Sequence, residues 1–471
     1  MTFQVPDKTL RVGIVVDNPK RDLKGLILVA QKLIDDGYAT VFLIPMYYQR
    51  TDIQVLNLDV LIINYARKNN KVLIQDYVLM GIKVFVLDTE GGILSTDSTD
   101  SPENWAKMFC EDGFPDLISG YFFWGRLTYE AFIEYSGLRQ NRLSLTGCPR
   151  YDQGHPSWSK ILAPKYSNHI LINTNFSAVN PLHSSSLEEE KKSFLSVGWP
   201  EKYIDQLIQN LLRAQVQLMD DICYVSKMLP CEHFVLRHHP FESNYVYERR
   251  FLDHENVFVD GSGDIFDSIN GAKCVLHLNC GSSADALISG VPSISLEYLN
   301  NRVMSLHTPL PSKISLRAKN RQDVVNLISK IDDLKSSELM EKIYRHYVKD
   351  YFYLNDGNAS ARVCDGLKEI LDTIKSDTEE LDTPVVAVKR NLMWALREFF
   401  HLFSRLAGSR LVAGIRDVLQ PSRKAKAFSC VEVQEILSKI EAGKKVVARN
   451  FTGGAFDAQF CSIEVCEKQI D

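Results

Sequence analysis

Two short apolar runs that each end in a polar turn constrain the fold of this chain most. The first run covers residues 233–236 and the second covers residues 275–278, and an apolar segment typical of a helix, residues 284–288, follows the second turn. A buried strand followed by a turn and a helix is the repeating unit of a parallel α/β sheet. In open sheets of this kind, ligands bind at the carboxyl ends of the strands. We therefore expect a ligand site at these two turns.

The side chains of the two turns suit a phosphate group. The polar or conformationally special residues there are Arg237, His239, Pro240, Asn279, Gly281, Ser282 and Ser283. Arginine and histidine neutralise a phosphate and donate hydrogen bonds to it, and proline fixes the turn. The second turn adds backbone N–H groups and two hydroxyls at a helix start. Serine at a helix start is also a common N-cap, so a structural use of Ser282 and Ser283 stays open. The pattern predicts a bound nucleotide monophosphate or diphosphate.

Two other strand ends extend this predicted site. Asn173, Thr174 and Asn175 follow the apolar run at 169–172 and can donate hydrogen bonds to a phosphate or a sugar, although a capping turn is an equal alternative. Glu297 follows a short strand at 293–296, at a position suited to a ribose hydroxyl.

Length and composition limit the class of protein. At 471 residues the chain is too long for one core, so we expect two or three domains. The formal net charge of −5 argues against a general nucleic-acid binder. Ten cysteines without a Cys-X-X-Cys pair indicate free thiols in a reducing cytosol. Residues 1–10 show no secretory signal and no run of eighteen apolar residues occurs, so we expect a cytoplasmic protein.

Strand and helix patterns divide the chain into two α/β halves. Short β-branched runs at 11–17, 40–44, 59–63, 83–87 and 143–146, with helical spacing at 23–36 and 69–80, predict an N-terminal Rossmann-like domain over 1–152. Prolines and a glycine in 153–168 indicate a linker. A second Rossmann-like, nucleotide-binding domain follows over 169–376. Two such domains facing each other across a cleft are the GT-B glycosyltransferase architecture, here with a C-terminal helical extension.

Residues 377–427 combine an acidic hinge with a basic amphipathic helix. Within 389–418, tryptophan, phenylalanine and leucine alternate with five arginines, and Lys426 belongs to the basic excess that follows. Such a helix binds an anionic membrane surface, or else packs on the second domain with its arginines in solvent. We expect peripheral contact with anionic inner-membrane lipid as one of these two alternatives. Residues 428–471 form a small helix-and-strand appendage.

The first domain supplies candidate catalytic carboxylates. Asp88 and Glu90 follow the strand at 83–87 and precede two glycines. Glycosyl transfer needs a carboxylate at the anomeric centre, acting as base or as nucleophile. We favour Glu90, because Asp88 lies nearer the strand and serves equally well as a turn cap. The cations at neighbouring strand ends, which suit the carboxylate of an acidic sugar, are Lys20, Arg21 and Arg67.

We expect no metal and no other cofactor. The chain has no Asp-X-Asp pair after a strand, and its histidines are isolated apart from the pair at 238–239.

Seven segments together resemble the bacterial surface carbohydrate biosynthesis protein family. They are DNPKRD (17–22), NYAR (64–67), LDTEGG (87–92), FWG (123–125), TGCPRYD (146–152), RHHPFE (237–242) and NDGNA (355–359). The likeness spans roughly residues 10–375, and the family is similar to GT-B transferases that use CMP-activated acidic sugars, including Kdo transferases and sialyltransferases.

The resemblance implies specific roles. In those relatives a His-Pro motif and a Ser-Ser motif bind the CMP portion, matched here by His239-Pro240 and Ser282-Ser283. An acidic-residue-then-glycine motif carries the catalytic carboxylate, matched by Glu90-Gly91. Thr89 stands where the relatives have an acidic residue beside the catalytic one, which leaves open whether Asp88 or Glu90 acts.

The sequence thus predicts a metal-independent glycosyltransferase of lipopolysaccharide or capsule biosynthesis. It would move a Kdo-like sugar from a CMP-activated donor to a glycan or glycolipid acceptor, at the inner face of the cytoplasmic membrane and without nucleic acid. The alternatives are a CDP-glycerol or CDP-ribitol phosphate transferase and a non-catalytic nucleotide-sugar-binding membrane scaffold. A UDP-sugar epimerase is the least favoured interpretation.

Overall fold

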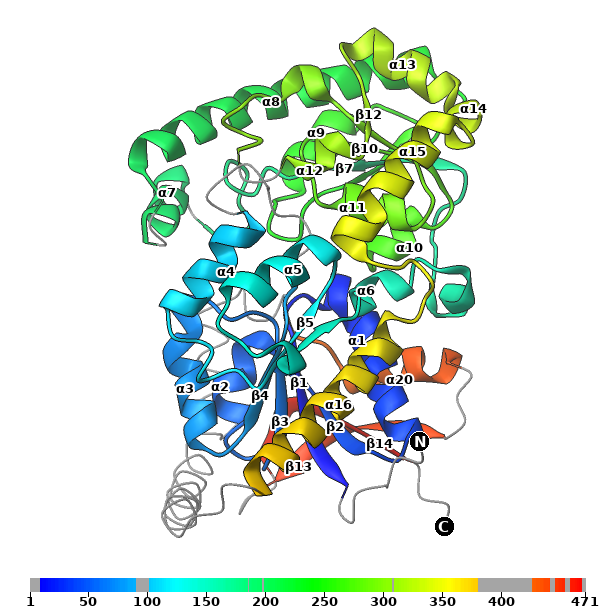
Figure 1. Cartoon of the computed structure of the whole chain (residues 1–471). Coiled ribbons are helices and arrows are strands. Elements are labelled where there is room, and N and C mark those ends of the chain that lie inside the picture. Colours follow the sequence, from blue (N-terminus) through cyan, green and yellow to red (C-terminus); the bar gives the residue numbers. More distant parts are fainter. Residues whose placement is uncertain are drawn as a thin grey trace. The chain divides into compact units, whose positions relative to one another are not determined.

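The computed structural model describes residues 9–89, 101–184, 186–196, 199–306, 309–379, 426–440, 445–453 and 458–467. The chain forms two compact units. Unit 1 comprises Met1–Gly92, Pro102–Ile161 and Lys349–Asp471, and unit 2 comprises Ile93–Ser101 and Leu162–Val348. Each unit is built on its own sheet (Figure 1).

Unit 1 has six parallel strands at the centre of its sheet. They are β1 (Leu10–Val16), β2 (Ala39–Pro45), β3 (Val60–Ile63), β4 (Lys83–Leu87), β5 (Gly120–Phe123) and β6 (Leu143–Leu145), in the order β2-β1-β3-β4-β5-β6. The register pairs Val12 with Val41 and Val60, so the carboxyl ends of β1 and β3 meet at one edge. The five strands expected from the sequence are confirmed, whereas β5 was not expected.

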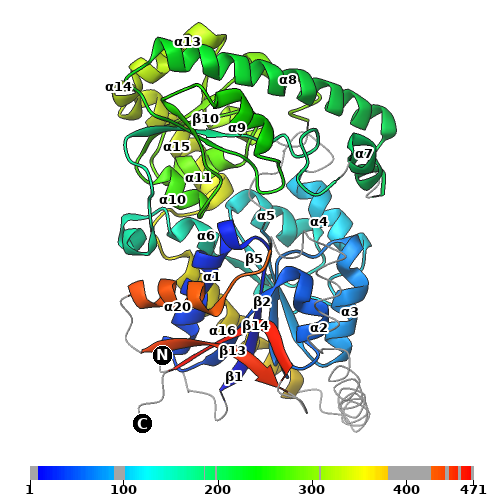
Figure 2. The same cartoon turned by 180° about the vertical axis from the view of Figure 1, so that it is seen from behind.

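The C-terminal residues complete this sheet. Strand β14 (Ala458–Glu467) pairs antiparallel with β2, and β13 (Val446–Gly453) pairs antiparallel with β14 (Figure 2). Helix α20 (Cys430–Lys439) adds Val433 and Leu437 to the same core as Ile463 and Val465 of β14. The predicted appendage is therefore a part of unit 1, because its apolar side chains have their burial there. Most of the predicted hinge and basic helix, residues 380–425 of the segment 377–427, lies outside the described residues.

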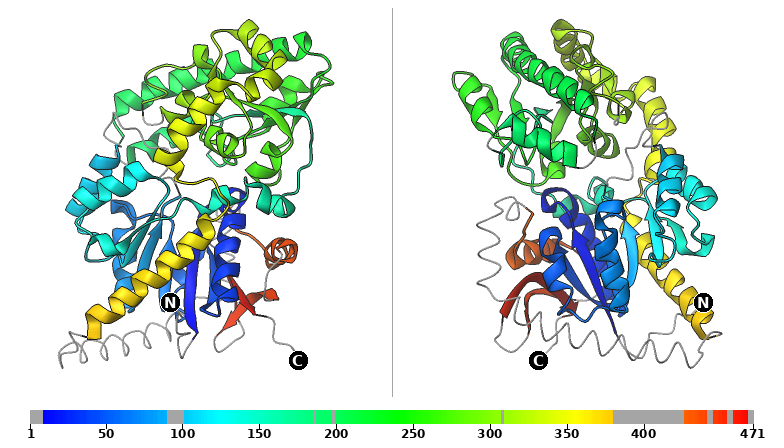
Figure 3. Two further views of the ribbon diagram at one scale, coloured as in Figure 1. Left: turned by 45° about the vertical axis from the view of Figure 1, so that its right-hand side comes forward. Right: turned by 90° about the vertical axis from the view of Figure 1, so that its left-hand side faces the viewer.

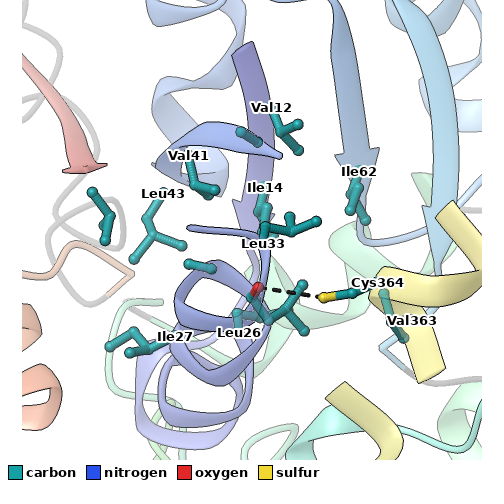
Figure 4. Close-up of a cluster of buried hydrophobic side chains, with 14 of the residues drawn as sticks. Val12, Ile14, Leu26, Ile27, Leu33, Val41, Leu43, Ile62, Val363 and Cys364 are labelled. Atoms are coloured by element: carbon teal, nitrogen blue, oxygen red, sulfur yellow. Dashed lines mark hydrogen bonds between the residues drawn. The ribbon is translucent and has the colours of Figure 1, made fainter. Parts of the chain in front are cut away.

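Helices cover both faces of the unit 1 sheet. One face carries α1 (Pro19–Asp35) and α16 (Ala359–Glu379) with α20, and the other carries α2 (Gln49–Asp52), α3 (Lys71–Leu79), α4 (Pro102–Glu111) and α5 (Arg126–Tyr135). Helix α1 begins with a proline in its first turn, and the Asn18 side chain accepts a hydrogen bond from the Lys20 backbone N–H. In the core beneath α1, Cys364 Sγ lies 3.5 Å from Val29 O (Figure 4).

Unit 2 is a six-stranded parallel sheet. Its strands are β7 (His169–Asn173), β8 (Phe234–Arg237), β9 (Val257–Val259), β10 (Ala272–His277), β11 (Ser293–Ser295) and β12 (Leu316–Arg317), in the order β12-β11-β10-β7-β8-β9. The chain starts at β7, builds β8 and β9 on one side, and crosses to β10 on the other. The order of strands therefore reverses between β7 and β10.

The faces of the unit 2 sheet are also covered by helices. Helices α8 (Glu201–Met228), α9 (Tyr245–Phe251) and α13 (Arg321–Ser329) share one core, and α10 (Ile265–Ile269) and α11 (Ser282–Ile288) share the other. The remaining helices and helical turns of the described chain are η1 (Met46–Tyr48), η2 (Lys68–Asn70), η3 (Gln140–Arg142), α6 (Pro149–Asp152), η4 (Pro156–Ile161), α7 (Leu187–Ser196), η5 (Glu297–Leu299), α12 (Leu310–Lys313), α14 (Ile331–Lys335), α15 (Glu338–Tyr347) and η6 (Val348–Phe352).

Helix α16 belongs to unit 1, which differs from the sequence-based boundary at residue 376. Figure 3 shows it running beside the strands of unit 1. Its apolar face, with Val363 and Leu367, is buried in the unit 1 core. The Asp152 carboxylate accepts hydrogen bonds from the backbone N–H groups of Ala359 and Ser360, at 2.9 and 2.7 Å. A buried carboxylate therefore caps the start of this helix.

This cap explains two segments that the sequence singled out. Residues 146–152 and 355–359 lie together, because Arg362 Nε also donates to Thr146 O (2.7 Å) and its Nη1 pairs with Asp356. Their first role is to fasten α16 to unit 1.

We predict that Asp152→Ala lowers the free energy of unfolding by about 2 kcal/mol, because two buried backbone N–H groups lose their acceptor. Urea denaturation followed by circular dichroism measures the change. Asp365→Ala, which removes an exposed carboxylate from the same helix, is the matched control and should stay within about 0.5 kcal/mol of wild type. Equal stabilities for the two variants would contradict the capping role.

Candidate functional site

The carboxyl edge of the unit 2 sheet brings predicted binding residues together at the reversal of strand order. Asn173 ends β7, and Ser282 follows the turn after β10. Asn173 Nδ2 donates a hydrogen bond to Ser282 Oγ at 2.8 Å, and both residues are buried. Because β7 and β10 are neighbours, this bond spans the position where open α/β sheets bind their ligands.

The side-chain oxygen of Asn173 is available to accept a hydrogen bond. Its Oδ1 is buried and has no hydrogen-bond partner among the described residues. A buried acceptor without a donor costs free energy, about 1–3 kcal/mol for a typical polar group. A ligand hydroxyl or N–H group at this edge would recover that loss.

The turn after β10 adopts a conformation that few residue types tolerate. Asn279 has a φ of 49°, in the left-handed region where asparagine is the most acceptable residue after glycine. Its Nδ2 donates to Met304 O at 2.6 Å. Gly281 has a φ of −59° and provides no side-chain cap for α11.

Neither serine of this turn is an N-cap. Helix α11 starts at Ser282, one residue after the N-cap position, and Ser283 Oγ donates back to Cys280 O at 3.0 Å. Because α11 has only seven residues, its terminus alone is a weak anion site. The Ser282 hydroxyl accepts from Asn173 Nδ2 and donates to Cys280 Sγ at 3.2 Å.

His277 supports the same turn from below and was not expected from the sequence. Burial lowers the pKa of His277 to about 3, so the ring is neutral. Its Nδ1 accepts from the Cys280 backbone N–H at 3.4 Å, and its Nε2 therefore carries the proton and donates to Ser315 Oγ at 2.8 Å. No feature of the sequence distinguishes this histidine from a packed core residue.

Glu242 joins the two predicted binding turns of β7 and β8. It is fully buried, and its carboxylate accepts hydrogen bonds from Thr174 Oγ1 (2.7 Å), Phe176 N (2.5 Å) and Tyr247 Oη (2.7 Å). Burial raises the pKa of Glu242, although these donors oppose the shift. In the sequence Glu242 belongs to the segment RHHPFE (237–242), from which no role for it could be predicted. Its partners Phe176 and Thr174 are 66 and 68 residues away in sequence, so these two contacts follow only from the fold.

The Arg237 side chain donates hydrogen bonds to other residues of unit 2. Its guanidinium is buried and donates to Ser262 O, Gly263 O and Ser268 Oγ, at 2.5, 2.8 and 3.2 Å. These three hydrogen bonds hold the 260–268 loop, and the predicted phosphate contact of Arg237 stays a prediction.

The other predicted residues of this edge are more accessible. His239 is half-buried, and its Nδ1 accepts from the Phe241 N–H at 3.2 Å, as the Pro240 turn requires. Asn175 is exposed. Glu297 accepts from Ser295 Oγ at 3.1 Å and is half-buried at the end of β11.

The carboxyl edge of unit 1 also gathers its predicted polar strand ends. Thr89 Oγ1 donates to Asp17 Oδ2 at 3.2 Å, and the Thr89 N–H donates to Asn64 O at 2.9 Å. These contacts join the ends of β1, β3 and β4. The polar turns that follow β1, β3 and β4 therefore lie together at one edge of one sheet.

Each predicted cation of this edge has a different environment. Arg21 binds Asp22 in a two-bond arrangement at 2.9 and 3.0 Å. Arg67 is 43% exposed and its Nη2 lies 3.4 Å from Asp88 Oδ1. Lys20 is exposed. Arg67 thus combines access to solvent with a carboxylate partner.

Asp88 is buried and shared between two donors. Besides Arg67, the Tyr121 hydroxyl lies 3.4 Å from Asp88 Oδ2. Burial raises the pKa of Tyr121 well above its usual value, and the Asp88 charge adds to the shift, so this hydroxyl stays protonated. Glu90, the favoured catalytic residue, lies outside the described residues.

A cavity of ≈ 20 Å³ lies at the same edge, with room for about one water molecule. Its polar lining is Asp22, Asp88, Thr89 and Arg150. In the sequence, Arg150 belongs to the segment TGCPRYD (146–152), and no role was predicted for it. It is buried, with its guanidinium 4.9 Å from the Trp124 ring centroid and 4.7 Å from that of Tyr151.

Across the part of the chain that the structure describes, no group of three or more histidine, cysteine or acidic side chains is arranged to hold a metal ion. Among the same residues, none of the helices is long and apolar enough to cross a membrane.

Comparisons with known proteins rest on structure alone. No protein-family model matches the sequence, and no curated protein matches it. The S. aureus MnaA–UDP complex is 11% identical, with a TM-score of 0.50 over 77% of this chain and 97% of that chain.

Two further solved structures are similar at lower scores. The Neisseria meningitidis UDP-GlcNAc 2-epimerase bound to UDP-GlcNAc is 13% identical, with a TM-score of 0.45 over 76% of this chain and 100% of its own. The wall teichoic acid polymerase TagF is 13% identical, with a TM-score of 0.48 over 78% of this chain and 90% of its own.

The chain has a GT-B-type fold. Two α/β units with parallel central sheets, joined in one chain, confirm the fold class expected from the sequence. At such identities the likeness concerns the fold, and function has to be argued from the residues at the two sheet edges.

Replacing Glu242 tests the network under the unit 2 edge. Glu242→Ala leaves three buried donors without an acceptor, so we expect it to lower the free energy of unfolding by at least about 3 kcal/mol. Glu242→Gln keeps one acceptor oxygen and should lose less. Urea titrations measure both, and Glu255→Gln, at an exposed position, is the control.

The same variants predict a pH dependence. Because the pKa of Glu242 is raised on folding, the native state binds the proton more tightly than the unfolded chain. The stability of wild type relative to Glu242→Gln is therefore greatest below the unfolded pKa and falls as the pH rises through the folded pKa. A difference that grows with pH would contradict this assignment.

Proposed function

We propose that this chain is a GT-B enzyme of bacterial surface-glycan biosynthesis that binds a nucleotide-activated donor at the carboxyl edge of unit 2. In its specific form, the proposal is a metal-independent glycosyltransferase that moves a Kdo-like acidic sugar from a CMP-activated donor to a surface glycan. The observation that carries the proposal is the Asn173–Ser282 bond at the reversal of strand order, with the unpartnered Asn173 Oδ1 beside it.

The nucleotide class is supported by the edge and by one neighbour. A hydroxyl-rich, phosphorylated ligand suits an edge that offers an open acceptor, serine hydroxyls and backbone N–H groups. A structure of this fold, the MnaA complex, holds UDP, which is a pyrimidine nucleotide. The cytidine part of the proposal rests on the resemblance of His239-Pro240 and Ser282-Ser283 to the CMP-binding motifs of Kdo transferases and sialyltransferases.

The surface-glycan role is supported by the motifs that resemble the surface carbohydrate biosynthesis family. The acceptor would then be a glycan or glycolipid. Peripheral contact with anionic lipid through residues 389–418 stays a prediction.

For the chemical step we propose Glu90, with Asp88 as its supporting neighbour. Asp88 is buried and already shares its charge with Arg67 and Tyr121, which suits a residue that shapes the turn. The more exposed Arg67 and Lys20 would meet the carboxylate of an acidic sugar, a role that their access to solvent supports. A leaving CMP carries one phosphate, so hydrogen bonds from the unit 2 edge can stabilise it without a metal ion.

A ligand panel tests the donor class. We expect CMP to stabilise the protein against thermal unfolding more than UDP, CDP or GDP does, reaching about 2.7 kcal/mol at one hundred times its dissociation constant. Ser282→Ala should weaken the effect, whereas Ser289→Ala, at the far end of α11, should not. Stabilisation by CDP or UDP alone would overturn the cytidine monophosphate assignment.

Product analysis then separates the competing activities. Release of CMP from CMP-Kdo in the presence of acceptor supports the transferase. Turnover of CDP-glycerol alone would identify a polyol phosphate transferase, and conversion of a UDP-sugar would identify an epimerase-like enzyme. Binding of CMP without release would identify a non-catalytic scaffold.

Catalytic variants test the carboxylates. Glu90→Gln should slow transfer by at least about a hundredfold, the usual contribution of an acid–base group. Asp88→Asn should slow it less, and Glu103→Gln, an exposed residue of unit 1, is the control. A Glu90→Gln, Asp88→Asn double variant with near-native transfer rates would sink the site assignment.

A further inference from the structure

A lysine from the far end of the chain reaches the carboxyl edge of the unit 1 sheet. Lys426 Nζ lies 2.6 Å from Asp17 Oδ1, and the two residues are 409 positions apart in sequence. Both side chains are largely buried, with exposures of 14% and 12%. The ion pair is therefore a built contact, better shielded from solvent than a pair on an open surface.

Lys426 is linked through Asp17 to the turn after β4. Asp17 uses one carboxylate oxygen for Lys426 and the other for the Thr89 hydroxyl. Thr89 is in turn fixed by its backbone hydrogen bond to Asn64. In sequence, Thr89 stands between Asp88 and Glu90, the two candidate catalytic residues. Two contacts, Lys426 to Asp17 and Asp17 to Thr89, thus connect the C-terminal segment to that turn.

The C-terminal segment holds Lys426 in place by regular structure. The register between β14 and β2 pairs Ile463 with Leu43, close to the end of β2. The Ser462 backbone N–H and hydroxyl both donate to the buried Asp52 carboxylate, at 2.8 and 2.6 Å. Lys426 also lies 3.6 Å from Met46 Sδ, just after β2. Its position is therefore anchored to the same sheet as Asp17.

We propose that Lys426 is a positioning residue of the unit 1 edge, and that residues 426–467 are an integral part of the working domain. Lys426 holds the Asp17 carboxylate in the orientation that fixes Thr89 and so sets the end of β4, where Asp88 lies. Its effect on catalysis rests on the proposed function, whereas its hold on Asp17 does not.

The charges around Asp17 show why Lys426 matters. Burial acts to raise the pKa of Asp17, but Lys426 and Arg21 outweigh it and hold the pKa below its usual range. Arg21 Nη2 is farther away, at 3.4 Å, and already serves Asp22. Tyr65 is a further titratable group that interacts with Asp17, and burial and the Asp17 charge raise its pKa, so it is neutral at ordinary pH. Without Lys426, Asp17 keeps its burial and loses its nearest cation.

Three variants of the full chain test this proposal. Lys426→Met removes the charge, Lys426→Arg keeps it, and Lys439→Met removes an exposed lysine of α20 as a matched control. Carbon-13 NMR of the Asp17 carboxyl follows its titration in each. Steady-state transfer with CMP-Kdo gives kcat, the donor KM and the pH profile. The CMP-dependent shift in melting temperature reports the donor edge of unit 2.

In Lys426→Met we expect the pKa of Asp17 to rise, with recovery in Lys426→Arg and no change in Lys439→Met. We expect kcat to fall by about tenfold to a hundredfold, the usual cost of misplacing reacting groups, with the donor KM and the CMP shift unchanged. An Asp17 titration that is the same in wild type and Lys426→Met overturns the proposal. So does a kcat within about twofold of wild type. If wild type transfers from none of the donors while the Asp17 titration still responds, the proposed function fails and the hold of Lys426 on Asp17 stands.

Discussion

Buried carboxylates hold the strand-end turns of this protein, and both candidate edges depend on them. A buried carboxylate is shielded from water and needs several hydrogen-bond donors from the protein. Each buried carboxylate therefore connects segments that are distant in sequence. Asp152 fastens α16 to unit 1, and Glu242 fastens the turn after β7 to that after β8. Asp17 joins β1 to the turn after β4 and to the C-terminal segment. The sheets set the positions of the strand ends, and these contacts fix the orientation of the polar side chains there.

Turns that are held by buried hydrogen bonds suit a site that must be rigid before its ligand binds. Catalytic and binding groups act best when their supporting hydrogen bonds are already made, since no reorganisation is then needed during the reaction. The neutral His277 under the turn after β10 is another example, because its pKa of about 3 keeps its Nδ1 free to accept from the Cys280 N–H. The left-handed Asn279 in the same turn has a structural cost that its hydrogen bond to Met304 offsets.

The sequence predicted the parallel sheets well because their signals are local. β-branched runs ended by polar turns identify strands, and parallel pairing then brings those turns to one edge. Strand β5, with the sequence GYFF, was missed because four apolar and aromatic residues fit a strand or a buried helix equally. The position of α16 and the pairing of β14 with β2 depend on contacts made over hundreds of residues, which no local pattern records. For the same reason Glu242 and Lys426 were not recognised as members of the two edges.

The hydrogen bonds that Arg237 makes within unit 2 bear on the kind of nucleotide-activated donor that this unit can bind. Of the predicted nucleotide contacts, Arg237 is the one with a permanent positive charge, and it donates three hydrogen bonds to Ser262 O, Gly263 O and Ser268 Oγ. Under the proposed function, the phosphate would also be met by Ser282, the backbone N–H groups of its turn and His239. Such groups stabilise one phosphate more readily than a diphosphate, whose second charge calls for a further cation or a metal ion. Within the proposed function, this edge suits a donor activated by a nucleoside monophosphate, from which CMP leaves.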